Sequence, residues 1–565
     1  MRMPAVFPSL RGYHRGWLRG DLVAGLTVWA VLVPECLAYA SIAGVSPVVG
    51  LYAAPPALVL YAALGSSRHL IVGPMSASAA LSAATVAGFA AQGSADYVAL
   101  TAAIAVVTGV VALVAGLLRL GFLAGFISEP VLKGFIIGLA LTIAAGQLPA
   151  LFGVGKGEGD FFEKIWDLIT DLGDTNGWTL AVGLVSLALV LTLKRYVPLM
   201  PAALIAVLFG ILAVIVLNLE DKGVDVVGEI ASGLPPLGLP DVDAGDYLPL
   251  VAGAVGITLV GFAEGLAAAK TYAAKSGYDV DANKELLGVG AANLGAGLSS
   301  GMVVNGSLSK TAVNGGAGAR SQVSGLVVAV LTVVTLLFLT GLFEQLPEAT
   351  LAAVVIAAVI ELVDISALVR LYRLWTSRLG TIYGPAARVD FLAAVAAMLG
   401  VLVFDTLPGL FLGIAVSMVL LLYRTSKPNV AVLGRVAGDG GVWVDRVRHP
   451  ELPAEPGVVV VRVESGLFFT NADYVRQRIR SHVRSESPRA VVLDAETVPF
   501  VDVTAAQMLV DLSHDLAADN VALLLARDIG QVRDILRRAG AETTLTQMFP
   551  SVEEAVAAAR DRDHR

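Results

Sequence analysis

Long apolar runs constrain the fold of this 565-residue chain more than any other feature. A helix that crosses the hydrocarbon core of a bilayer needs roughly 20 apolar residues. Because 56% of the residues are hydrophobic and only 15% are charged, these runs predict a polytopic α-helical membrane protein and not a soluble globule. The runs lie near residues 21–43, 47–64, 97–118, 125–149, 177–195, 199–218, 247–273, 285–301, 320–343, 346–363, 387–405 and 407–425.

Two further apolar segments, near 74–91 and 305–317, are too short or too interrupted to span a bilayer. We interpret both as half-helices, which gives fourteen transmembrane segments, seven on each side of the loop 219–246. The two short segments are third in their halves. Paired interrupted segments at corresponding positions are typical of inverted-repeat transporters, with the substrate site where the half-helices meet. We therefore expect a 7+7 inverted repeat, with repeat one over 21–218 and repeat two over 247–427.

Charge placement sets the expected orientation. The first 20 residues contain Arg11, Arg15 and Arg19, so by the positive-inside rule we expect this segment in the cytoplasm and the first helix to leave from there. The first apolar run continues at spanning length without a small-residue cleavage pattern, so we interpret it as a helix and not as a cleaved signal peptide. Loop 219–246 then falls outside, and its charged residues are mainly acidic.

A different pattern begins after residue 427. We expect a linker over 428–455 and a small α/β domain over 456–560, in the cytoplasm by the helix count. Buried-strand patterns at 458–463, 490–494 and 521–525 alternate with helical patterns at 472–483 and 504–517.

The segment 305–316 combines polar residues with a position between two apolar runs. Non-spanning backbone survives at membrane depth only where protein buries it or where it lines a cavity. We expect a half-helix to begin near Ser307, with its free N–H groups and Lys310 facing an anion. The hydroxyls of Ser307, Ser309 and Thr311 could contact the same anion or cap the helix. The alternative for Lys310 is a side chain that snorkels to the cytoplasm.

Two acidic residues are candidates for ion coupling. Glu35 follows Pro34 in the first apolar run, and a proline inside a helix breaks its hydrogen bonding. Burial disfavours the charged form of a carboxyl group, so Glu35 is a candidate for proton uptake. The alternative is a structural ion pair with Lys310. Glu264 occupies a similar place in the first helix of the second half, where the alternative is a hydrogen bond to a neighbouring helix end.

Other classes of site find little support. The single cysteine, Cys36, excludes an intrachain disulfide and a cysteine-based zinc site, and the six histidines show no metal-ligand spacing. No phosphate-binding loop or nucleophile–base pair is recognisable, so we do not expect an enzyme. No cofactor, metal or nucleic-acid partner is expected; the partners we expect are a small anion, a coupling proton or sodium ion, and the bilayer.

Several motifs together resemble the SulP family of anion transporters, to which pendrin and prestin are related. The resemblance covers nearly the whole chain, and the C-terminal domain resembles the STAS domain of that family. The motifs include Pro-Glu-Cys-Leu-Ala-Tyr at 34–39, Gly-Ser-Ser-Arg-His-Leu-Ile-Val-Gly-Pro at 65–74, Glu-Pro-Val-Leu-Lys-Gly-Phe at 129–135, Asn-Lys-Glu-Leu-Leu-Gly at 283–288 and Ser-Lys-Thr-Ala-Val-Asn at 309–314.

The resemblance implies a core domain that moves against a gate domain, a homodimer, and an anion held between the third and tenth helices. It places the anion site on Met75, Ser76, Ala77, Ser309 and Lys310, with Glu35 and Tyr39 beside it. Two residues depart from the family pattern. Glu35 stands where a glutamine is usual, which favours proton coupling, and Lys310 replaces an arginine, which keeps the charge but loses bidentate binding.

One residue of the C-terminal domain is a candidate for regulation. Thr504 occupies the place where related anti-sigma antagonists are phosphorylated. Asp502, just before it, fits an ordinary helix N-cap.

We expect a secondary active transporter in the cytoplasmic membrane, most simply a proton-coupled sulfate symporter that works by alternating access. A bicarbonate or C4-dicarboxylate symporter, coupled to protons or sodium, remains open as an alternative. An anion exchanger or channel, a nucleobase symporter and a purely regulatory protein are further alternatives.

Overall fold

The computed structural model describes residues 6–125, 128–155, 157, 159–197, 200–360, 363–376, 384–404, 406–436, 442–538 and 548–561. Parts of the runs expected at 125–149, 199–218, 346–363 and 387–405 lie outside these residues. The chain divides into two compact units, Met1–Ser417 and Met418–Arg565.

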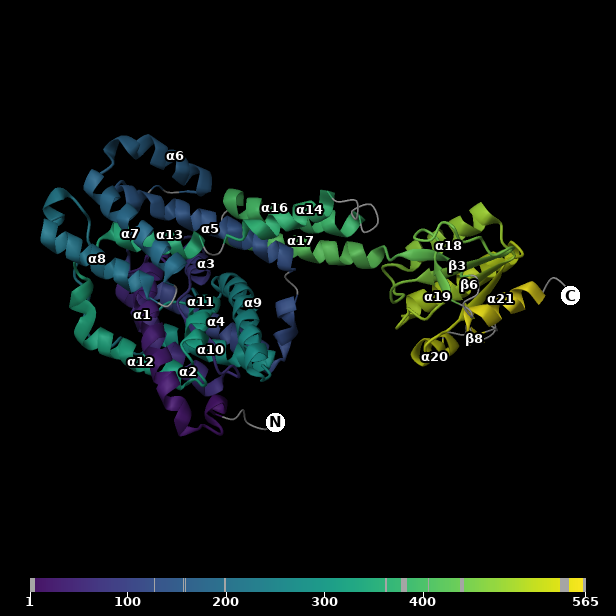
Figure 1. Cartoon of the computed structure of the whole chain (residues 1–565), viewed down its shortest axis with the longest axis horizontal. Coiled ribbons are helices and arrows are strands. Elements are labelled where there is room, and N and C mark those ends of the chain that lie inside the picture. The colour runs from purple at the N-terminus through teal and green to yellow at the C-terminus, as the bar shows by residue number, and fades with distance from the viewer. Residues whose placement is uncertain are drawn as a thin grey trace. The chain divides into compact units, whose positions relative to one another are not determined.

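The first half of the chain contributes seven helices at the expected places (Figure 1). Short 3₁₀ turns lie before, between or after them: η1 (Pro8–Leu10), η2 (Arg15–Trp17), η3 (Leu120–Gly125), η4 (Leu172–Asp174) and η5 (Glu220–Lys222). The helices are α1 (Leu18–Ile42), α2 (Pro47–Leu64), α3 (Ser76–Val86), α4 (Ala95–Leu117), α5 (Glu129–Phe152), α7 (Gly177–Tyr196) and α8 (Ala202–Leu217).

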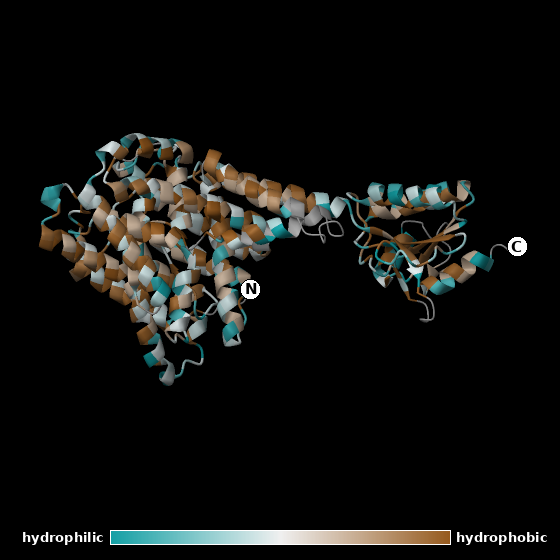
Figure 2. Ribbon diagram, turned by 45° about the horizontal axis from the view of Figure 1, so that its top comes forward, coloured by the Kyte–Doolittle hydropathy of each residue, from teal (hydrophilic) through white to brown (hydrophobic). Residues whose placement is uncertain are grey.

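The second half repeats this order. Its helices are α9 (Val251–Ser276), α10 (Ala282–Leu298), α11 (Leu308–Gly316), α12 (Val323–Val334), α13 (Glu348–Ile360), α16 (Gly384–Phe404) and α17 (Thr406–Ser426). Helix α12 continues through a π-helical turn, η6 (Thr335–Leu339), and a 3₁₀ turn, η7 (Thr340–Phe343). Eight of the described helices have the length and hydropathy of membrane spans, and Figure 2 shows their largely apolar surfaces. The predicted polytopic helical fold is confirmed.

Two amphipathic helices were not anticipated by the sequence analysis. Helix α6 (Phe161–Asp171) follows the fifth helix of the first repeat, and α14 (Ile365–Thr376) follows the fifth helix of the second. Helix α6 is well defined because Asp160 and Glu163 form a capping box at its start. Both are too short to span a bilayer, and a search for spanning runs overlooks helices of this kind.

Close helix packing supports the segments that lead to the half-helices. Helix α10 packs between α2 and α4, and an added Cβ at Gly290 would lie 2.8 Å from the backbone N of Leu113 in α4. Glycine therefore permits this approach. One turn further along α10, the Asn293 amide donates to the Val304 carbonyl at 2.7 Å and accepts from its N–H at 3.0 Å. The chain entering the second half-helix is held in place by these two bonds.

The C-terminal unit is a sheet covered by helices on both faces. The strands are β3 (Val430–Arg435), β4 (Trp443–Asp445), β5 (Val458–Val463), β6 (Ala490–Asp494), β7 (Ala522–Ala526) and β8 (Met548–Phe549), in the order β4-β3-β5-β6-β7-β8. The pairs from β5 to β8 are parallel, and β3 is antiparallel to both β4 and β5. The helices are α18 (Ala472–Glu486), α19 (Val503–Ala518), α20 (Gly530–Arg538) and α21 (Val552–Asp561).

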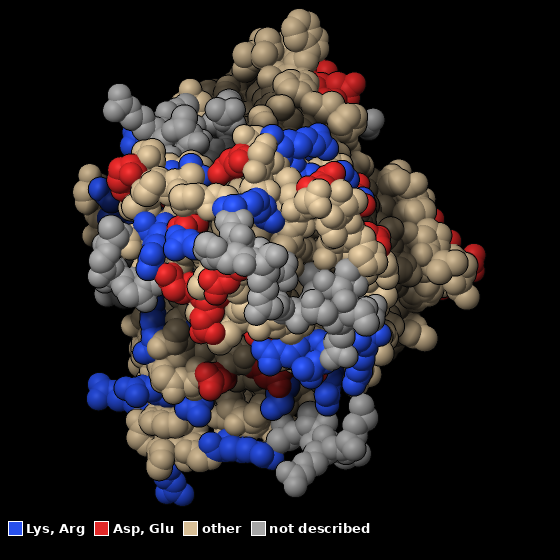
Figure 3. Space-filling view, turned by 90° about the vertical axis from the view of Figure 1, so that its right-hand side faces the viewer, with Lys and Arg blue, Asp and Glu red and all other residues tan. Residues whose placement is uncertain are grey.

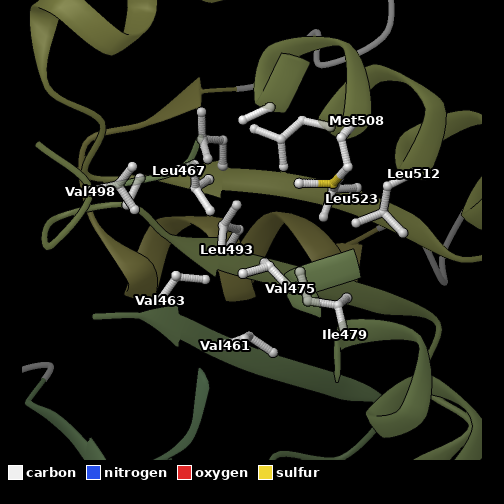
Figure 4. Packing of buried hydrophobic residues seen from close by; sticks show 14 of the residues in the cluster. Val461, Val463, Leu467, Val475, Ile479, Leu493, Val498, Met508, Leu512 and Leu523 are labelled. Atoms are coloured by element: carbon white, nitrogen blue, oxygen red, sulfur yellow. The ribbon is translucent and has the colours of Figure 1, made fainter. Parts of the chain in front are cut away.

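Alternation along the buried strands builds a core on each face of this sheet. Val461 and Val463 of β5 face α18 and α19, where Val475, Ile479 and Leu512 meet them (Figure 4). Val458 and Val460, which point to the other face of the sheet, belong to a second cluster with α21. The expected strands and helices are thus confirmed within a residue or a few.

The treatment of residues 428–455 as a linker needs correction. Strand β3 lies inside that segment and pairs with β5 from Val430↔Val463 to Leu433↔Val460, and β4 pairs with β3 in turn. The apolar residues of β3 are buried in the cores on the two faces of the sheet, which a local sequence pattern does not reveal. Lys, Arg, Asp and Glu side chains are interspersed on the protein face drawn in Figure 3, in contrast with the apolar helices of Figure 2.

Candidate anion-binding site between two half-helices

Two three-residue strands bring the half-helices together. Strand β1 (Ile71–Gly73) pairs antiparallel with β2 (Asn305–Ser307), with Gly73 opposite Asn305 and Ile71 opposite Ser307. Each strand leads into a half-helix, β1 into α3 and β2 into α11. Because the strands run in opposite directions, the two helices begin at opposite ends of this short ribbon and leave it in opposite directions. Only three residue pairs separate these ends, so the first N–H groups and positive dipole ends of both helices lie beside the same short ribbon.

Lys310 lies at this junction and is buried. Its side chain is 1% exposed, and its Nζ lies 2.6 Å from Oε2 of Glu35. The same ammonium donates to the Pro74 carbonyl at 3.1 Å and lies 5.1 Å from the centre of the Tyr39 ring. The snorkelling alternative for Lys310 is therefore wrong. The ion-pair alternative for Glu35 describes the geometry of this state.

Helix α1 supplies the residues that face Lys310. Glu35 and Tyr39 are four residues apart, so they share one face of the helix, and both are buried. Pro34 precedes Glu35 inside the helix and removes the hydrogen bond to the Ala30 carbonyl. Helices α1, α3 and α11 thus converge on one charged group.

The three hydroxyls of α11 have different surroundings. Ser307 caps the helix by accepting from the Lys310 N–H at 3.3 Å. Thr311 is buried and accepts from the Ile71 N–H at 3.1 Å, which ties α11 to β1. Ser309 is exposed, with its Oγ 3.1 Å from that of Ser307. Among the three, Ser309 is the hydroxyl most open to a ligand.

The start of α3 is lined by small residues. Met75 is the N-cap of α3 and is half-buried, while Ser76 and Ala77 are buried behind it. Small side chains here leave the first N–H groups of α3 unobstructed. With Ser309 and Lys310 across the junction, two helix ends, a hydroxyl and an ammonium, all groups that can interact with an anion, are brought together.

Comparison with known proteins agrees with this geometry. The model of the sulfate permease family matches residues 18–383, and that of the STAS domain matches residues 449–555. The chain belongs to the sulfate permease family. Anion transport is the activity that this membership supports.

Relatives match over nearly the whole chain. A protein of Mycobacterium tuberculosis (strain CDC 1551 / Oshkosh) named "Probable sulfate transporter MT1781" is 38% identical, with 98% of this chain and 97% of the relative aligned. "Sulfate transporter 1.3" of Arabidopsis thaliana is 31% identical over 92% of this chain and 82% of its own length.

Two solved structures are similar in fold. The inward-facing murine Solute Carrier 26 family member A9 anion transporter aligns with a TM-score of 0.86 at 24% identity, over 98% of this chain and 94% of that chain. The transmembrane domain of the cyanobacterial bicarbonate transporter BicA aligns with a TM-score of 0.62 at 23% identity, over 70% of this chain and 98% of that chain.

In this sulfate permease family member, Glu264 lies on the helix that packs against β2. Gly261, one turn earlier on α9, approaches Asn305 so closely that an added Cβ would lie 2.0 Å from its Nδ2. Glu264 is half-buried, and within the described ranges it makes no hydrogen bond or ion pair. The expected alternative, a hydrogen bond to a helix end, is not seen there.

The sequence analysis missed two buried polar residues. Asn305 donates to the Ser78 hydroxyl at 2.6 Å, which joins β2 to α3, and its Oδ1 has no hydrogen-bond partner among the described residues. Glu285 of α10 accepts from the Tyr61 hydroxyl at 2.7 Å and from the backbone N–H groups of Ser66 and Ser67. A carboxylate within an apolar run is a signal that could have identified Glu285.

In the STAS domain, Asp502 accepts from the Ala505 N–H at 2.8 Å and is the N-cap of α19. The interpretation of Asp502 as an ordinary cap is confirmed. Thr504 is exposed in the first turn of the same helix.

Proposed function

We propose that this family member is a proton-coupled sulfate symporter that works by alternating access. The observation that supports this most directly is the buried Lys310–Glu35 ion pair, 2.6 Å long, at the junction of two half-helices. Sulfate is the substrate named for the relatives that match most of the chain.

The proposed coupling follows from charge. While Glu35 is ionised, it neutralises Lys310 and repels an approaching anion. Two unit charges 4 Å apart interact by about 1 to 4 kcal/mol at the dielectric constants of water and of a protein surface. A proton on Glu35 removes that repulsion and leaves Lys310 and the helix ends to hold the anion. Each ligand then strengthens binding of the other, as reciprocal coupling requires.

Charge counting gives Glu264 a role in the same proposal. Sulfate carries two negative charges, so a single proton on Glu35 leaves transport with one net negative charge. A second proton on Glu264 makes the loaded carrier electrically equivalent to the empty one. We assign Ser309, Lys310 and the ends of α3 and α11 to the anion, and Glu35 and Glu264 to two protons. Met75, Ser76, Ala77, Tyr39, Ser307 and Thr311 shape this site.

Topology and regulation complete the proposal. The arginines before α1 favour a cytoplasmic N-terminus, and the even number of proposed spans then puts the STAS domain in the cytoplasm. We propose a homodimer, in keeping with the resemblance to the family, and Thr504 as a phosphorylation site.

The test is uptake of radiolabelled sulfate into proteoliposomes under imposed proton or sodium gradients, with bicarbonate, fumarate, uracil and chloride as competitors. We expect accumulation driven by a proton gradient, competed best by unlabelled sulfate and unaffected by membrane potential. Glu264→Gln should make uptake sensitive to the potential. Accumulation driven only by sodium, or stronger competition by bicarbonate or fumarate, would contradict the proposal in favour of the alternative symporters.

A further inference from the structure

A cavity of about 560 Å³ lies at the end of α11 opposite Lys310. Its walls come from the start of α1, the segment before β1, the C-terminal end of α9 and the turn after α11. It is separate from the anion site proposed above, since neither Lys310 nor any other residue assigned to that site lines it.

Three cationic side chains line this cavity: Arg68, Lys275 and Arg320. Within the part of the chain that the structure describes, none of them forms an ion pair, and no carboxylate is among the lining residues. The Arg68 guanidinium lies 5.3 Å from the centre of the Tyr278 ring, and the Lys275 ammonium lies 4.9 Å from that of Tyr272. These aromatic contacts position the cations without neutralising them.

One buried carboxylate, that of Asp21, contacts the wall of this cavity. Asp21 is fully buried and accepts from the backbone N–H groups of Arg320 and Ser321 and from the Ser321 hydroxyl. His69 is also committed, because its Nδ1 lies 3.0 Å from the Tyr278 hydroxyl and its Nε2 lies 3.1 Å from the Ala319 carbonyl. The three cations that line the cavity outnumber the one carboxylate that contacts its wall, so the cavity carries a net positive charge.

A neighbouring cavity provides an internal contrast. It has a volume of about 460 Å³ and shares Arg68 and Tyr278 with the first, but Asp279, Asp281 and Lys284 line it as well. Its two carboxylates balance its two cations, whereas no carboxylate lines the first cavity, so an anion is attracted more strongly to the first.

We propose that the cavity lined by Arg68, Lys275 and Arg320 is a second anion site, which binds the phosphate group of a phosphate ester. Guanidinium groups bind phosphate through paired hydrogen bonds. The volume is within the range of about 300 to 1,000 Å³ that small-molecule sites occupy, so there is room for the esterified group beside the phosphate. The flat side chains of Trp17 and Tyr272 supply apolar surface for that group.

Occupancy of this site links two elements of the transport unit. Lys275 belongs to α9, and Arg320 follows the half-helix that carries Lys310. A bound phosphate would therefore hold the end of α9 against the turn after α11. The ester can come from a phospholipid headgroup or from a soluble metabolite, because the proposed topology puts this end of the protein at the cytoplasmic membrane surface, where tryptophan is common.

The test measures binding to the full-length protein in detergent after lipid removal. Glycerol 3-phosphate and dihexanoyl phosphatidic acid are the two probes, and the signal is the Trp17 fluorescence obtained by subtracting the response of Trp17→Phe. We expect saturable binding that Lys275→Gln and Arg320→Gln each weaken about fivefold, the effect of roughly 1 kcal/mol per cation near a membrane surface. Both side chains are exposed, so these variants should fold.

Two controls keep the outcome decisive. Lys270→Gln removes an exposed cation from α9 outside the cavity and should leave the affinity unchanged. Lys310→Ala should also leave it unchanged, which separates this site from the transport site. Tighter binding of phosphatidic acid assigns the ester to a lipid, and equal or weaker binding assigns it to a soluble metabolite. No saturable Trp17 response to either probe, or equal weakening by Lys270→Gln, would overturn the proposal.

Discussion

The two half-helices occupy equivalent places but differ in chemistry. Each follows a three-residue strand, and the strands pair as a two-fold axis requires. Aligned by their N-caps, Met75 and Ser307, the two helices have Ser78 of α3 at the position of Lys310 in α11. Helix α11 has a side-chain cap and a buried cation, whereas α3 has neither. The repeated backbone thus provides the geometry of the site, and one repeat provides its charge.

The largest expected effect is that of removing this charge. Lys310→Ala should lower sulfate uptake by more than about 100-fold, because truncating one partner of a buried, hydrogen-bonded charge pair costs about 2 to 5 kcal/mol of binding, and Lys310 would pair with the bound anion. Proteoliposome uptake at equal protein content measures it. Ser78→Ala, at the equivalent position of α3, is the matched control and should cost far less. Lys310→Arg keeps the charge and should recover part of the rate. Normal uptake by Lys310→Ala would show that the anion does not bind at this junction.

The next largest effect is on the coupling of sulfate transport to the proton gradient, and it is expected from a substitution of Glu35. Glu35→Gln keeps the shape of the side chain but cannot ionise, so Lys310 stays available to the anion at every pH. We expect downhill sulfate exchange to persist, while an imposed proton gradient no longer drives accumulation beyond what Glu264 alone supports, a drop of at least about tenfold. The measurement is the steady-state ratio of internal to external sulfate with and without the gradient. Accumulation equal to that of the wild type would exclude Glu35 from coupling.

The sequence predicts where both half-helices begin, because the residues that mark these starts lie in the same short segments. Pro74 and Ser307 mark where the half-helices begin, and the observed starts at Ser76 and Leu308 agree. The pairing of β1 with β2 could not be predicted, because three residues carry no periodicity and their partner is more than 200 residues away. The same limit hid β3, which pairs with the later strand β5 and whose apolar residues are buried in the cores on the two faces of the sheet.

Side-chain partners within the site were harder to predict than the site itself. Whether Glu35 pairs with Lys310 depends on the packing of α1 against α11, so both alternatives were consistent with the sequence. The hydroxyl of Thr311 was a candidate ligand, yet the structure directs it to the Ile71 N–H. Residue type identifies a group that can bind an anion, whereas tertiary contacts decide which of its bonds are already made.

A substitution that disturbs the packing of α9 against β2 should have a smaller effect, which is measured as a change in stability. Gly261→Ala would bring a Cβ within 2.0 Å of Asn305, so we expect a loss of about 1 to 3 kcal/mol in stability from overpacking. At Gly265, in the same helix, the nearest atom to an added Cβ is the Gly306 Cα at 3.4 Å, an ordinary contact. Gly265→Ala is therefore the control and should melt within a degree or two of the wild type. Equal melting temperatures for both variants would contradict this prediction, because they would show that β2 can move away from the added Cβ without loss of stability.

The smallest expected effect tests the cap that α11 has and α3 lacks. Ser307→Ala removes the acceptor for the Lys310 N–H, and loss of such a cap costs about 1 kcal/mol. We expect a slightly lower melting temperature and a several-fold rise in the KM for sulfate, because the start of α11 would hold Lys310 less firmly. Met75→Ser offers α3 a cap of the same kind and should raise stability by a similar or smaller amount. If Ser307→Ala lowers uptake as much as Lys310→Ala does, then the hydroxyl itself contacts the anion, and the charge of the site is shared with the polar groups of the helix end.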